Sequence, residues 1–167
     1  MHRLIKDGAL IDDQWVLVRE DSDPGILQAL PGRKLLVPYR FWRFSQDAIA
    51  DYWGQVSIWL DSSERVSDIR EPVGSFPVIG LNFPVFSDGR SYTNARELRE
   101  QLGYQGEIRA IGDVLRDQLY YMQRCGFNAF QLRQDQDPDE CLRAFEDFHA
   151  GYQASIDQPQ PLFRRRQ

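Results

Sequence analysis

The fold is decided by three consecutive segments, FPVFSDGRSYTNAR (83–96), GEIRAIGDVLRDQ (106–118) and RCGFNAF (124–130). Together they predict, in chain order, a strand, a loop, a helix, a strand, a loop, a helix and a strand. Polar and charged residues gather where the strands lead into the helices. In a parallel sheet these junctions share one edge, where open α/β proteins bind their ligands.

The same alternation extends outward from these segments. Strands are expected at 35–37, 56–60, 78–83, 107–111 and 129–132, with helical patterns between them. The alternation predicts an α/β domain built on an open, mainly parallel five-stranded sheet with helices on both faces, flavodoxin-like or Rossmann-like. A partial βα-barrel is the alternative, because βα repeats look alike in sequence, although a complete eight-fold barrel needs about 250 residues.

The first 32 residues follow a different pattern. Asp7-Gly8 and Asp12-Asp13 separate short apolar runs, and Asp-Gly between such runs is a strong hairpin signal. We expect residues 1–32 to form a β-hairpin appendage, a small antiparallel meander that continues past Asp12-Asp13. Residues 33–153 should form the α/β domain and 154–167 a flexible tail. The last helix is expected to begin at Asp137, which can cap it.

Composition narrows the classes of function. The chain has 167 residues, of which 42% are hydrophobic, and this suits one packed domain. A net charge of -5 argues against general nucleic-acid binding, which needs a concentrated basic surface. No apolar run reaches the roughly 18 residues of a membrane span, and the N-terminus lacks the apolar core of a signal peptide. We therefore expect a cytoplasmic protein without nucleic-acid or membrane partners.

The loop after the strand at 78–83 is the first candidate site. Ser91 or Thr93 can cap the next helix, and the free N–H groups of a helix N-terminus together with Arg90 favour an anion. The alternative is an ordinary turn in which Asp88 pairs with Arg90.

A second candidate follows the strand at 107–111. Asp113 is a good helix cap, and Arg116 lies one turn further along. The functional interpretation directs the Asp113 carboxylate into the same cleft as that of Asp88. Two carboxylates on adjacent strand ends can act as acid and base if one of them is desolvated. Asp88 and Asp113 are therefore candidate catalytic residues, and Arg116 is a candidate binding residue.

Trp42 and Arg43 follow the first strand of the expected sheet. An aromatic ring beside an arginine can stack on a planar ligand such as a flavin. Aromatic residues at a strand-to-helix junction also commonly fill the core. Both interpretations are compatible with the sequence.

Cofactor motifs are missing from the sequence. Cys125 and Cys141 lie on apolar helix faces and are expected in the core, and His2 and His149 are far apart. There is no Cys-x-x-Cys for zinc or iron–sulfur binding and no Gly-x-Gly-x-x-Gly for NAD. No metal site is predicted, and a flavin stays compatible with the chain.

The central segments carry a family resemblance that extends over residues 33–150. They resemble an uncharacterised bacterial family, a domain of unknown function whose genes often lie beside assimilatory sulfite reductase and whose members are labelled predicted oxidoreductases involved in sulfite reduction. The matching residues are FSDGR (86–90), AR (95–96), LR (98–99), GY (103–104), GE (106–107), RA (109–110), GDVLRDQ (112–118) and RCGF (124–127).

The resemblance implies an accessory role in assimilatory sulfite reduction, by passing electrons to a separate sulfite reductase or assisting it. Siroheme and the iron–sulfur cluster would belong to that partner, because this chain lacks the thiolate ligands. Two rival functions stay open. One is a small stand-alone enzyme that acts on an anionic substrate at the strand ends, and the other is a binding module without catalysis.

Overall fold

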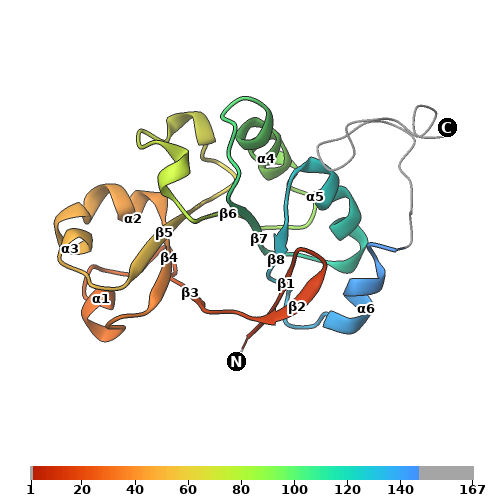
Figure 1. Cartoon of the computed structure of the whole chain (residues 1–167), viewed down its shortest axis with the longest axis horizontal. Helices are drawn as coiled ribbons and strands as arrows, with labels where there is room; N and C mark the ends of the chain where they lie inside the picture. Colours follow the sequence, from red (N-terminus) through yellow and green to blue (C-terminus); the bar gives the residue numbers. More distant parts are fainter. Residues whose placement is uncertain (1, 147–167) are drawn as a thin grey trace.

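The computed structural model describes residues 2–146, which form one eight-stranded mixed sheet curled into a half-barrel with six helices (Figure 1). The strand order across the sheet is β2-β1-β8-β7-β6-β5-β4-β3. The strands are β1 (Arg3–Lys6), β2 (Ala9–Asp12), β3 (Trp15–Leu17), β4 (Lys34–Pro38), β5 (Gln55–Leu60), β6 (Val78–Phe83), β7 (Glu107–Gly112) and β8 (Ala129–Phe130). The helices are α1 (Ile26–Ala29), α2 (Tyr39–Phe44), α3 (Gln46–Ala50), α4 (Arg90–Glu100), α5 (Leu119–Cys125) and α6 (Pro138–Arg143), with short 3-10 turns η1 (Val66–Asp68), η2 (Val73–Ser75) and η3 (Arg116–Gln118).

Six neighbouring strands, β3 to β8, are parallel and follow one another in chain order. Among the described strands, β1 alone runs in the opposite direction to the others, and it pairs antiparallel with both β8 and β2. The central strands are almost continuously buried, as expected for parallel strands covered on both faces.

The two faces of the sheet bury different partners. The outward side chains of the strands, such as Ile58 and Leu81, join helix residues such as Leu98 in the main core. The inward side chains form a second, smaller cluster around Trp59 and Ile111 that contains strand residues alone. The helices therefore cover the convex face, and the concave face is filled by the sheet's own side chains.

The prediction of an open, mainly parallel five-stranded, flavodoxin-like sheet with helices on both faces is wrong. The five expected strands are present as β4 to β8, but they lie in sequential order without the reversal that such folds require. When each right-handed crossover places the next strand on the same side of the previous one, all helices lie on one face of the sheet. The sheet can then curl toward its uncovered face. The observed half-barrel is closer to the partial βα-barrel that was the alternative.

The N-terminal hairpin is present where Asp7-Gly8 predicts it. Asp7 and Gly8 both adopt positive φ, at 49° and 79°, which is the requirement of a two-residue hairpin turn. The expectation of a continuing antiparallel meander at Asp12-Asp13 is wrong, because β2 and β3 lie at opposite edges of the sheet. Only Asp13 and Gln14 separate these two strands, so the connection crosses the mouth of the half-barrel (Figure 1).

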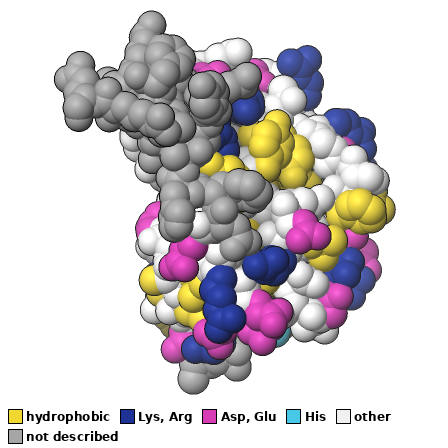
Figure 2. Space-filling model, turned by 90° about the vertical axis from the view of Figure 1, so that its right-hand side faces the viewer, with side chains coloured by type: hydrophobic (Ala, Val, Ile, Leu, Met, Phe, Trp, Pro, Cys, Tyr) yellow, Lys and Arg dark blue, Asp and Glu magenta, His cyan; other side chains and the backbone are white. Residues whose placement is uncertain are grey.

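The last described helix begins as the sequence predicts. Asp137 accepts hydrogen bonds from the backbone N–H groups of Asp139 and Glu140 at 2.9 and 3.4 Å. The tail expected at 154–167 and His149 lie outside the described residues. Within residues 2–146, every helix falls short of the length and hydrophobicity needed to cross a bilayer. Figure 2 shows the side of α5 and α6, where acidic, basic and hydrophobic side chains are interspersed.

Candidate functional site

Two adjoining cavities open at the carboxyl ends of the parallel strands. The first, the carboxyl-edge cavity, has a volume of about 310 Å³ and lies between the loop after β5 and the start of α4; its lining residues are Ser62, Ser63, Glu64, Arg65, Arg90, Thr93, Asn94 and Glu97. The second cavity, of about 350 Å³, shares Ser63 and Glu64 and extends toward α2 through Glu20, Pro38, Tyr39, Arg40, Arg43 and Phe44. The edge of the sheet that the sequence predicts to bind ligands therefore contains two cavities.

Arg90 is fixed at the rim of the carboxyl-edge cavity. Its Nε and Nη2 donate to the two carboxylate oxygens of Asp88 at 3.0 and 2.7 Å, and Nη2 also donates to Ser62 Oγ at 3.0 Å. This planar fork holds the guanidinium in one orientation. The hydrogen bonds from Arg90 lower the pKa of Asp88 well below its usual range. A carboxylate of this kind is a poor proton acceptor at neutral pH, so the geometry favours a binding role for the pair.

The lowered pKa of Asp88 gives a testable titration. Its carboxyl carbon should keep the NMR shift of the ionised form well below pH 4, whereas in Arg90→Gln the midpoint should return toward about 3.9. Because the folded pKa lies below the unfolded one, the ion pair contributes fully above the ordinary aspartate pKa. Its contribution is lost as the pH falls through the lowered value. An unshifted midpoint in the wild type would show that the Asp88–Arg90 fork does not form in solution.

The end of β6 is held by a small polar frame. Asn82 Nδ2 donates to Asp61 Oδ1 at 2.9 Å, which joins the ends of β5 and β6. Ser91 is buried, and its hydroxyl donates to the carbonyl oxygen of Asn82 at 2.7 Å. Ser91 therefore fastens the start of α4 to β6, whereas the exposed Thr93 lines the cavity.

Asp113 lies at the same edge of the sheet but has other partners. It follows β7, which pairs in parallel with β6, and its Oδ1 lies 3.6 Å from Nη1 of Arg133. Arg133 in turn forms a closer pair with Asp135 at 2.6 Å and lowers the pKa of that carboxyl to about 2. Asp88 and Asp113 thus belong to separate ion-pair groups at one edge, and their shared catalytic role stays a prediction.

The remaining candidate binding residues are dispersed. Arg116 Nε donates to the backbone carbonyl of Glu140 in α6 at 3.2 Å. Trp42 Nε1 donates to Glu71 at 3.2 Å, and its ring packs edge-on against Phe76. Arg43 is exposed and lines the second cavity. The structure therefore brings Arg43, Arg90 and Thr93 to the adjoining cavities and leaves Trp42 in a packing position.

Two features of this edge were missed by the sequence analysis. Glu64 lines both cavities, and burial raises its pKa. Its Oε1 accepts a hydrogen bond from the backbone N–H of Asp61 at 2.9 Å. Arg65 lines the first cavity and has no ion pair within residues 2–146. The run DSSER (61–65) directly after a buried strand was the available signal, since polar residues at strand ends form binding sites.

Both cysteines are buried, as predicted. Cys125 in α5 and Cys141 in α6 are free thiols within the main core. Burial raises the pKa of each thiol, which keeps it in the unreactive protonated form.

The fold and this edge define an α/β half-barrel with a polar cavity at the carboxyl ends of its strands. The model of a bacterial protein family of unknown function (DUF934) matches residues 57–163, more than half of the chain, and the protein belongs to this family. Neither the curated proteins nor the solved structures yield a match.

Proposed function

We propose that this protein is an accessory component of assimilatory sulfite reduction, which binds a small sulfur oxyanion at the carboxyl-edge cavity and serves a separate sulfite reductase. The pathway rests on the family resemblance. The oxyanion rests on one structural observation, which is the gathering of arginines and hydroxyl groups around adjoining cavities at a single sheet edge.

The lining suits an oxyanion in both charge and hydrogen bonding. Four arginines line the two cavities, against three glutamates. The side chains of Ser63 and Thr93 offer hydroxyl donors beside Arg65. Arginine recognises oxyanions through parallel N–H···O bonds, and its charge persists at any physiological pH.

The side chains that could hold a metal cofactor favour an accessory role over reductase activity. Reduction of sulfite to sulfide takes six electrons and relies on a metal cofactor, for which the protein supplies ligation and positioning. An iron–sulfur cluster needs four thiolates, whereas the sequence has two cysteines, both committed to the core. The electrons would therefore reach sulfite on the partner enzyme.

Calorimetric titration with sulfite tests the binding step. Arg90→Ala should weaken sulfite binding about tenfold, the effect of losing one charge-assisted hydrogen bond. Its stability should change little, because the Arg90 side chain is largely exposed. Arg19→Ala is the matched control, since Arg19 is exposed and its partner Asp21 is 3.8 Å away. Equal sulfite affinity in all three proteins would reject the cavity as the binding site.

Growth of a deletion strain tests the pathway. Loss of the gene should slow growth on sulfate or sulfite, and sulfide or cysteine should rescue it. Normal growth on sulfite with full sulfite reductase activity in extracts would reject the accessory role. The absorption spectrum of the protein purified without added ligand separates the two modes of assistance, because bound flavin would indicate electron transfer.

Glu64 favours a second candidate function, a stand-alone enzyme acting on an anionic substrate. A carboxyl whose pKa is raised by burial, facing a polar cavity, is a typical general acid. If so, turnover of an anionic substrate should follow the titration of Glu64 and disappear in Glu64→Gln.

A further inference from the structure

A third cavity lies at the opposite end of the half-barrel from the carboxyl-edge cavity. It has a volume of about 420 Å³, and Trp15, Lys34 and Glu107, the first residues of β3, β4 and β7, are among its lining residues. The two-residue connection of Asp13 and Gln14 closes it on one side. Because three Cα–Cα steps span at most about 11 Å, this connection brings the two edges of the sheet close together. We name this space the amino-end cavity.

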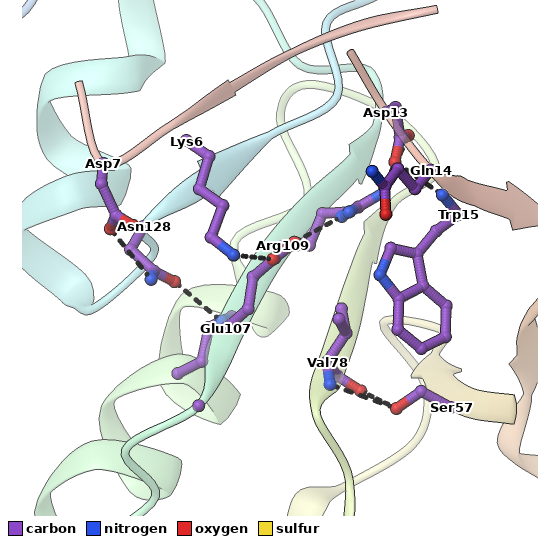
Figure 3. A network of polar contacts seen from close by, with 12 residues as sticks. Lys6, Asp7, Asp13, Gln14, Trp15, Ser57, Val78, Glu107, Arg109 and Asn128 are labelled. Carbon is purple, nitrogen blue, oxygen red and sulfur yellow. Dashed lines mark hydrogen bonds and ion pairs between the residues drawn. The ribbon is translucent and has the colours of Figure 1, made fainter. Parts of the chain in front are cut away.

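A buried chain of charges forms one wall of the amino-end cavity (Figure 3). Arg109 Nε donates to Glu107 at 2.8 Å, and Nη1 donates to both carboxylate oxygens of Asp13 at 2.9 and 2.8 Å. Lys6 Nζ lies 2.9 Å from the other oxygen of Glu107. The side chains of Arg109, Asp13 and Glu107 are all more than nine-tenths buried.

Small residues on the neighbouring strands leave room for the Arg109 side chain. Arg109 points inward from β7, and the residues beside it on the adjacent strands are Gly80 and Ala129. A large side chain at either position would compete with the guanidinium for space. Three of the four nitrogen–oxygen contacts among these groups involve Arg109 and the fourth involves Lys6, so these two cations already neutralise the two buried carboxylates.

Lys34 adds a positive charge that this wall does not neutralise. Its Nζ donates to the neutral amide oxygen of Gln14 at 2.9 Å and has no ion pair within residues 2–146. The remaining acidic lining residue, Asp12, is exposed to solvent at the rim. The chain contains 18 arginines and only two lysines, and both lysines line this one cavity.

The apolar part of the lining indicates what else a ligand carries. Leu4 and Ile11, opposite each other on β1 and β2, line the cavity together with the half-buried Trp15. Cavities of this size with an apolar wall and a few placed polar groups typically hold small organic molecules. The ammonium group of Lys34 beside these apolar side chains is complementary to a small ligand that carries one anionic group and a short apolar chain.

We propose that the amino-end cavity binds a small organic monocarboxylate, with its carboxylate at Lys34 and its apolar body against Trp15, Leu4 and Ile11. This site is separate from the oxyanion site proposed above, because the two lie at opposite ends of the strands. It does not depend on the role in sulfite reduction.

The two lysines provide a site-specific measurement. Protein labelled with ¹³C only at lysine gives two ε-methylene signals, and a saturating ligand at this site should shift the Lys34 signal strongly. The probes are straight-chain carboxylates from acetate to hexanoate, with the matched alcohols and amines and with inorganic sulfate. Affinity should rise about fourfold for each added methylene that is buried, and the alcohols and amines should not bind.

Two variants separate this site from its surroundings. Lys34→Gln should weaken hexanoate binding about tenfold or more, through loss of a charge-assisted hydrogen bond, and should leave the affinity for sulfite unchanged. Arg19→Gln removes an exposed positive charge elsewhere and should bind hexanoate as the wild type does. The proposal is overturned if neither lysine signal responds to any carboxylate. It is equally overturned if sulfate or the matched alcohol binds as well as hexanoate, or if Lys34→Gln binds hexanoate with wild-type affinity.

Discussion

Replacing Arg109 with methionine should lower the free energy of unfolding by about 3–5 kcal/mol, the cost of leaving buried charges without their partner. Asp13 and Glu107 would keep their carboxylates inside the sheet while losing the guanidinium that pairs with both. Because domains are stable by only about 5–15 kcal/mol, this is a large part of the total. Urea denaturation followed by tryptophan fluorescence measures the loss.

A triple variant identifies the cause of that loss. In Arg109→Met combined with Asp13→Leu and Glu107→Leu, no buried charge is left unpaired, and most of the stability should return, because apolar replacements of buried ion pairs are often neutral. Lys6 loses its partner in this variant at little cost, since its side chain is 36% exposed. Arg109→Met within about 1 kcal/mol of the wild type would contradict the argument, because a typical core substitution already costs that much.

The Arg109 network also shows why sequence reasoning found one part of the polar architecture and not the other. Asp88 and Arg90 are two positions apart, so their pairing can be anticipated from a local turn pattern. Arg109 and Asp13 are 96 positions apart, and no local pattern joins them. The signal that was present is the arginine itself, since a charge within an apolar strand is rarely buried without a partner.

Local elements were predictable because each depends on a pattern within a short stretch of sequence, whereas the order of the strands in the sheet does not. Apolar periodicity located the strands β4 to β8, and α5 ends at Gly126, which adopts the left-handed conformation that glycine favours at helix ends, with φ at 118°. Strand order depends on the direction in which each crossover adds to the sheet, and both directions give the same alternation. The curl of the sheet and the placement of β3 at its far edge therefore required the structure.

Substitution of Gly112 at the carboxyl edge of the sheet should lower the free energy of unfolding nearly as much as substitution of Arg109. Gly112 ends β7 with φ at 90°, and a Cβ atom there would lie within 3.0 Å of Asn82 Oδ1 and of the backbone oxygen of Phe83. The Phe83 oxygen is backbone of β6, so it cannot move without disturbing the paired strands, and Asn82 Oδ1 belongs to an amide that is bonded to Asp61. Gly112→Ala should therefore lower the free energy of unfolding by about 2–5 kcal/mol, combining the cost of left-handed backbone with that of overpacking.

Gly103 is the matched control for this prediction. Its φ is also positive, at 63°, but a Cβ atom there would meet nothing within 4 Å. Gly103→Ala should cost only the backbone term of about 1–2 kcal/mol, so the difference between the two variants in urea denaturation measures the crowding at β6. Since Asn82 also bonds to Asp61, the crowded variant should disturb the polar frame beside the carboxyl-edge cavity and weaken sulfite binding as well. Equal losses of stability in the two variants would show that β6 and β7 are not in close contact at their carboxyl ends.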